Sequence, residues 1–60
     1  MMTKLKAEEI AEILFTMTPV PTPNGLITGA GFQGTTIQFK YQDGTKGPAL
    51  QPEDLVEVSL

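Results

Sequence analysis

Carboxylates and hydroxyls are the side chains of this 60-residue sequence that could perform acid/base or nucleophilic chemistry, because it contains no histidine and no cysteine. Glu53 and Asp54 are adjacent in a short polar stretch, where capping or solvation is expected rather than a tuned acid/base pair. The same absences remove the imidazole and thiolate ligands that most zinc sites use. We therefore expect no enzymatic activity, no catalytic residue, no metal and no cofactor.

Two further patterns could bind small ligands, and each has a simpler interpretation. Glu8, Glu9 and Glu12 could bind a divalent cation, but they lack a loop of Asp, Asn and Gly, so we interpret them as the solvated face of a helix. The sequence GAGFQG at 29–34 has the G-x-G-x-x-G spacing of a pyrophosphate cradle. That cradle needs a helix after it, whereas a strand pattern follows here, so we expect a glycine-rich turn over 29–35.

Aromatic and basic residues in the second half could form a stacking platform for single-stranded nucleic acid. The aromatic candidates are Phe32, Phe39 and Tyr41, with Lys40 and Lys46 supplying positive charge. The chain has four Lys and Arg against seven Asp and Glu, a net charge of −3, which is the wrong sign for phosphate binding. Nucleic-acid binding is therefore the alternative function, and core packing is the expected role of the aromatic residues.

The first part of the chain has the pattern of an amphipathic helix over 3–17. Its apolar residues recur with i, i+3, i+4 and i+7 spacing, at Ala7, Ile10, Ala11, Leu14 and Met17. Acidic residues in the first turn stabilise the N-terminus of the helix through the helix dipole. Pro19 pushes the residue before it out of helical geometry. A proline-rich connector over 18–25 follows, with a turn at Asn24-Gly25. Its P-x-P-x-P spacing could also serve as a ligand for an SH3-type domain, although a stiff linker is the simpler interpretation.

The remainder, 26–60, has the alternation of antiparallel strands. Ile37, Phe39 and Tyr41 point to one face and the residues between them to the other. Asp43-Gly44 predicts a type I′ hairpin, and Gly47-Pro48 an edge or a bulge in the returning strand over 45–50. The sequence QPEDL at 51–55 predicts one helical or 3₁₀ turn, followed by a closing strand with Val56, Val58 and Leu60 on one face.

The segment GPALQPEDLVEV resembles the end of SH3-like small barrels, with Pro52, Leu55, Val56 and Val58 at the matching places. This resemblance covers about the last third of the chain. Together with the helical pattern of the first part, it favours a single α+β domain over 1–60, in which an N-terminal amphipathic helix packs on a small antiparallel SH3-like barrel or sheet. Peptide-binding SH3 domains carry a tyrosine in that closing turn and a tryptophan near mid-chain, whereas this chain has Leu55 and no tryptophan. The resemblance therefore implies a structural, assembly or regulatory use rather than recognition of proline-rich peptides.

A symmetric oligomer of such barrels can be an enzyme, as in the plasmid-type dihydrofolate reductases, whose Val-Gln-Ile-Tyr segment the IQF at 37–39 resembles. In that family the segment lies close before the closing turn, whereas a hairpin intervenes here. An enzymatic role is therefore the third interpretation.

The apolar arc of the predicted helix is wider than one core requires. Seven residues span about 200° of the helix, against the stripe of about 100° that packs on a single core. They are Ala7, Ile10, Ala11, Ile13, Leu14, Phe15 and Met17. A chain of this size also buries only about 60% of its unfolded surface, which favours association.

We therefore predict a small cytoplasmic regulator, inhibitor or assembly subunit that is a homo-oligomer or docks on a protein partner. Its predicted contact residues are Ile10, Ile13, Phe15 and Met17. No apolar run approaches membrane-spanning length, so we expect no membrane contact.

Overall fold

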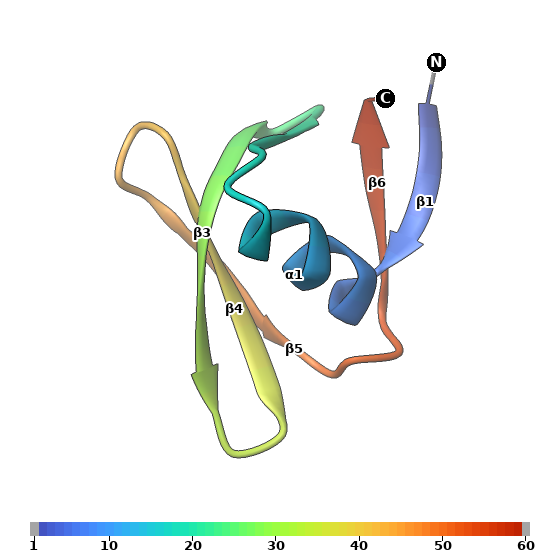
Figure 1. Cartoon of the computed structure of the whole chain (residues 1–60), viewed down its shortest axis with the longest axis vertical. Helices are drawn as coiled ribbons and strands as arrows, with labels where there is room; N and C mark the ends of the chain where they lie inside the picture. Colours follow the sequence, from blue (N-terminus) through green and yellow to red (C-terminus); the bar gives the residue numbers. More distant parts are fainter. Residues whose placement is uncertain (1, 60) are drawn as a thin grey trace.

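The computed structural model describes residues 2–59 and confirms an α+β chain with one short helix near the start and mostly antiparallel strands (Figure 1). The elements run β1 Met2–Lys6, α1 Ala7–Phe15, β2 Val20–Thr22, β3 Gly25–Gln33, β4 Thr36–Tyr41, β5 Lys46–Leu50 and β6 Leu55–Ser59. No helix in this part of the chain is long and apolar enough to cross a membrane.

The strands form two antiparallel sheets. β1 pairs with β6, and the other four strands pair in the order β2-β3-β4-β5. Figure 1 shows α1 between the β1–β6 pair and the four-stranded sheet. Residues 2–59 therefore form open sheets rather than a closed barrel.

The helix is shorter than the predicted 3–17, because the first residues belong to β1. Leu5 is the apolar residue among Thr3 to Lys6, and this segment pairs with the last strand, Leu5 lying opposite Val56. An isolated helical pattern does not reveal this pairing, since the partner lies at the other end of the chain. Leu5 consequently packs against the core from β1.

The turn at 51–54 caps the start of α1. The Ala7 N–H donates to the Asp54 carbonyl at 2.8 Å, and the Glu8 N–H donates to the Pro52 carbonyl at 3.1 Å. The Lys6 N–H donates to Glu9 Oε1 at 2.8 Å. Amide groups that lack a partner within a helix are thus satisfied by the turn and by a side chain. The expected turn forms as a hydrogen-bonded turn rather than a helical one, with the Asp54 N–H donating to the Gln51 carbonyl at 3.0 Å. Leu55, which was predicted to end it, already belongs to β6.

The chain leaves α1 through a residue with positive φ, two positions after Phe15. Met17 has φ 64°, and its N–H donates to the Leu14 carbonyl at 2.9 Å. Glycine is the usual residue at this place, because a side chain crowds the left-handed conformation. Met17 thus lies beyond the helix in which it was predicted.

Replacing Met17 by glycine should raise the unfolding free energy by about 1 kcal/mol, because it relieves this crowding. Little burial is lost, since the Met17 side chain is 91% exposed. Urea denaturation followed by circular dichroism measures the change. Met17→Ala removes the same exposed side chain but keeps the left-handed strain, so it should show no such gain; an equal gain in both variants would contradict this explanation.

The four-stranded sheet includes residues before and after Gly25 that were predicted to lie outside strands. Val20 to Thr22 form β2 within the expected connector, and Val20 is fully buried. Pro21 is tolerated because β2 is an edge strand. The glycine-rich segment predicted as a turn over 29–35 is instead mostly strand, since β3 continues to Gln33 and only Gly34-Thr35 form the turn.

The predicted hairpin at Asp43-Gly44 forms, but not with a type I′ turn. Gly44 has φ 93°, and Asp43 does not have positive φ. The Gly44 N–H donates to the Tyr41 carbonyl at 3.0 Å, and the Tyr41 N–H to the Thr45 carbonyl at 2.8 Å. This is the pattern of a three-residue loop with a glycine bulge. The Thr45 hydroxyl donates to the Asp43 carboxylate at 2.6 Å, and this hydrogen bond lowers the pKa of Asp43.

The predicted alternation in β4 is confirmed, with Ile37 and Phe39 buried and Gln38 and Lys40 exposed. β5 is an edge strand with a register shift opposite Gln38 and Lys40, as Gly47-Pro48 predicts. Val58 of the closing strand is fully buried, whereas Leu60 lies outside the described residues. The core cluster draws on the helix and on four strands: Ala7, Ile10, Val20, Ile27, Ile37, Phe39 and Val58.

Candidate functional site

Two exposed phenylalanines stack on each other where the end of α1 meets β3. The ring centroids of Phe15 and Phe32 lie 6.0 Å apart with planes inclined by 16°. Phe15 is 73% exposed and Phe32 is 55% exposed. Phe32 lies opposite Ile37 and so shares the face of the sheet that carries the core, yet half of its surface remains uncovered. We call Phe15 and Phe32 the aromatic patch.

A groove of about 350 Å³ includes this patch and runs between α1 and the β3–β4 hairpin. Its helix side consists of residues 8, 11, 12 and 15, whose i, i+3, i+4 and i+7 spacing places them on one face of α1. Its lining is Glu8, Ala11, Glu12, Phe15, Phe32, Gly34, Thr35, Ile37 and Pro52. We call it the α1–hairpin groove.

The helix side of the groove carries negative charge. Glu8 and Glu12 are exposed, and no lysine between residues 2 and 59 forms an ion pair with either carboxylate. Glu9 differs from them because it accepts the hydrogen bond from the Lys6 N–H. Among the residues that the structure describes, no three His, Cys, Asp or Glu gather closely enough to hold a metal ion. The groove therefore presents apolar surface beside two carboxylates that have no cationic partner within residues 2–59.

The four predicted contact residues lie in different environments. Ile10 is fully buried in the core, and Ile13 is half-buried and packs against the core. Phe15 and Met17 are exposed. The excess apolar surface expected of the helix is therefore present, but it lies at its C-terminal end and Ile10 does not contribute to it.

Sequence reasoning missed Phe32 as part of this surface, because it assigned the residue to a turn. The apolar residues Ala30 and Phe32 are two positions apart and the polar Gln33 follows, as in a strand with one buried face. The glycines at 29, 31 and 34 obscured this pattern. Only the pairing of β3 with β4 places Phe32 on the same face as Ile37.

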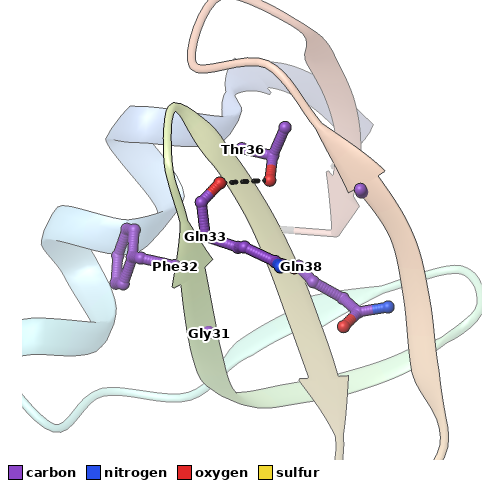
Figure 2. A pocket seen from close by; sticks show the side chains of 6 residues that line it. Gly31, Phe32, Gln33, Thr36 and Gln38 are labelled. Carbon is purple, nitrogen blue, oxygen red and sulfur yellow. Dashed lines mark hydrogen bonds between the residues drawn. The ribbon is translucent and has the colours of Figure 1, made fainter.

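A second concavity lies on the opposite face of the β3–β4 hairpin and is polar. Figure 2 shows Phe32 directed toward the helix, while Gln33 and Gln38 lie on the other side of the strands. The Thr36 hydroxyl donates to the Gln33 carbonyl at 2.7 Å, and Gln38 Nε2 donates to the Gly47 carbonyl at 2.8 Å. These groups are bonded within the sheet. This arrangement also separates Gln38 from the buried Ile37 and Phe39 of the IQF segment.

The predicted nucleic-acid platform is not assembled on one face. Phe39 is buried and Tyr41 half-buried on the core face, whereas Lys40 points to the other face, directly opposite Lys46 in β5. The lysines lie beside a shallow concavity that includes Gly29 and Gly31. The G-x-G-x-x-G sequence thus lies in a strand and a turn and is followed by β4, not by a helix.

Searches of family models, curated proteins and solved structures gave no match to this chain. The function is therefore inferred from the geometry of the chain.

Proposed function

We propose that this chain is a non-catalytic protein-interaction module that docks on a protein partner, or on a copy of itself, through the C-terminal end of α1. It would act as a small regulator, inhibitor or assembly subunit. The observation that carries the proposal is the aromatic patch, because two stacked phenylalanines expose 73% and 55% of their surfaces. Fully burying such a side chain stabilises a complex by about 1.5–3 kcal/mol, and aromatic residues are enriched at interfaces.

The backbone conformation of Met17 also supports a binding role for this end of α1. It keeps a left-handed conformation that glycine would adopt more easily, while its side chain is 91% exposed two residues after Phe15. Strain of this kind clusters at binding sites. A methionine there offers a flexible apolar contact, which glycine would not.

We also propose that the fold is an opened form of an SH3-like barrel in a cytoplasmic protein. Support for the fold comes from the β3–β4–β5 meander, the single turn at 51–54 and the return of β6 to pair with β1. Support for the compartment comes from the absence of cysteine, which suits a reducing environment. A fold of this kind does not define a function, so the docking proposal depends on the patch.

Serine substitution of the patch tests the proposal. Phe15→Ser and Phe32→Ser should each weaken self-association, measured by sedimentation velocity, or recovery of partners from the native host, by at least about tenfold. Leu55→Ser is the matched control, because Leu55 is also apolar and 62% exposed but lies outside the groove. Denaturation of each variant separates loss of binding from loss of folding.

A monomer at high concentration whose partner recovery is the same in wild type and both patch variants would contradict the proposal. Equal losses in Leu55→Ser and the patch variants would also contradict it, because they would indicate general stickiness.

The alternative function is a nucleic-acid-binding module, which the direct opposition of Lys40 and Lys46 favours. Like charges opposite each other in a sheet are destabilising, and an anion between them would relieve the repulsion. Retention on heparin with a steep salt dependence, lost in a Lys40→Gln, Lys46→Gln double variant, would support this alternative.

A further inference from the structure

We propose that the α1–hairpin groove binds a short cationic segment of a partner protein, with one apolar side chain on the aromatic patch and lysine or arginine beside Glu8 and Glu12. This inference rests on the proposed docking function and names the chemistry of its partner. It follows from the size of the aromatic patch, the shape of the groove and the negative charge of Glu8 and Glu12 on its helix side, which we call the acidic wall.

The aromatic patch alone is too small to hold a second globular subunit. A phenylalanine offers about 200 Å² of surface, so the exposed fractions of Phe15 and Phe32 correspond to about 250 Å² together. A stable interface between folded proteins buries about 800 Å² on each side. The groove volume of about 350 Å³ matches the small end of the range for ligand pockets, which is enough for one or two side chains.

The negative charge of the groove favours a positively charged partner. Glu8 and Glu12 are four residues apart on one helix face, where like charges repel, and no lysine within residues 2–59 pairs with them. A cationic side chain beside them would remove this repulsion. A second copy of the chain would bring another net charge of −3 and the same acidic wall, so charge disfavours it as the occupant.

Titration with two synthetic peptides of equal length tests the inference. Each carries a central leucine pair, flanked in one peptide by lysines and in the other by glutamates. Amide chemical shifts of the ¹⁵N-labelled full chain report the binding site and the affinity. We expect the lysine peptide to shift the amides of Ala11, Phe15, Phe32 and Gly34, and to bind at least about tenfold more tightly than the glutamate peptide. Its affinity should fall as salt is added.

The Glu8→Gln, Glu12→Gln double variant should lose about tenfold in affinity for the lysine peptide, because it keeps the shape of the wall and removes its charge. Glu57→Gln is the control, since Glu57 is an exposed glutamate on β6 outside the groove. All three substituted positions are exposed, and the amide spectrum of each variant shows whether the fold is kept.

The outcomes separate this inference from the docking function. Equal binding of both peptides in the groove, unaffected by the glutamine variants, would overturn the charge preference and leave docking by the aromatic patch intact. Binding of neither peptide, together with self-association that Phe15→Ser abolishes, would overturn the cationic segment in favour of a second copy. Binding of the lysine peptide away from the groove would also overturn it.

Discussion

Replacing Ile10 by alanine should lower the free energy of unfolding by about 2–5 kcal/mol, the loss expected when a large buried side chain is truncated. Ile10 is fully buried, and it belongs to the core cluster together with Val20, Ile27 and Val58. The truncation removes apolar contacts and leaves a cavity that the packed strands refill only partly. A 60-residue domain has about 3–9 kcal/mol of total stability, so this substitution should remove a large fraction of it.

Urea or thermal denaturation followed by circular dichroism measures this loss, and two variants calibrate it. Ile10→Val removes one methyl group and should cost about 0.5–1.5 kcal/mol. Leu55→Ala removes a side chain of similar size that is 62% exposed, so its effect should stay within about 0.5 kcal/mol. Similar losses for Ile10→Ala and Leu55→Ala would mean that α1 does not hold the core together.

Local patterns predicted the centre of the helix and the faces of β4, because these depend on periodicities within a few residues. Ala7, Ile10 and Ala11 are buried as a helical stripe, and Ile37 and Phe39 as a strand face. Those patterns could not locate the start of the helix. Residues 3–6 fit the first turn of a helix as well as they fit a strand, and only their pairing with β6 makes them a strand.

The details of the turns depended on loop length, which the sequence does not specify. Asp-Gly suits a two-residue turn, but Tyr41 and Thr45 are hydrogen-bonded across a three-residue loop, and within this loop Gly44 alone takes positive φ. Similarly, the glycines of 29–34 suggested a turn because glycine weakens strands. They are accommodated in β3 because that strand pairs with β4 over almost its whole length.

The candidate site was predictable from its helix side only. The width of the apolar arc indicated surplus surface on α1, and Phe15 is where that surplus lies. The stack with Phe32 joins two segments far apart in sequence, so no local spacing could indicate it. The acidic wall was likewise not predictable from local spacing. Glu8 and Glu12 have the pattern of ordinary solvated helix residues, and only the position of the hairpin beside them makes them part of a groove.

Gly25 begins β3 in a backbone conformation that other residues rarely adopt, with φ 137°. It lies opposite Thr22 in the tight β2–β3 connection, where the Thr22 hydroxyl donates to the Gly25 carbonyl at 2.7 Å. A Cβ atom there would lie 3.4 Å from Cδ1 of Tyr41, which is within ordinary contact distance. The obstacle to a side chain at this position is therefore the backbone conformation rather than space.

Gly25→Ala should accordingly lower the free energy of unfolding by about 1–3 kcal/mol, the cost of holding an alanine in a sparsely populated region or of moving the β2–β3 connection. Gly29→Ala is the matched control, because a Cβ at Gly29 would meet no atom within 4 Å and its φ is not positive. That variant should be neutral or gain about 0.4–1 kcal/mol, since alanine restricts the unfolded chain. Denaturation of both variants under one condition compares them directly. If Gly29→Ala were destabilised as much as Gly25→Ala, the loss could not be attributed to positive φ. If neither were destabilised, the β2–β3 connection would have to relax readily around residue 25.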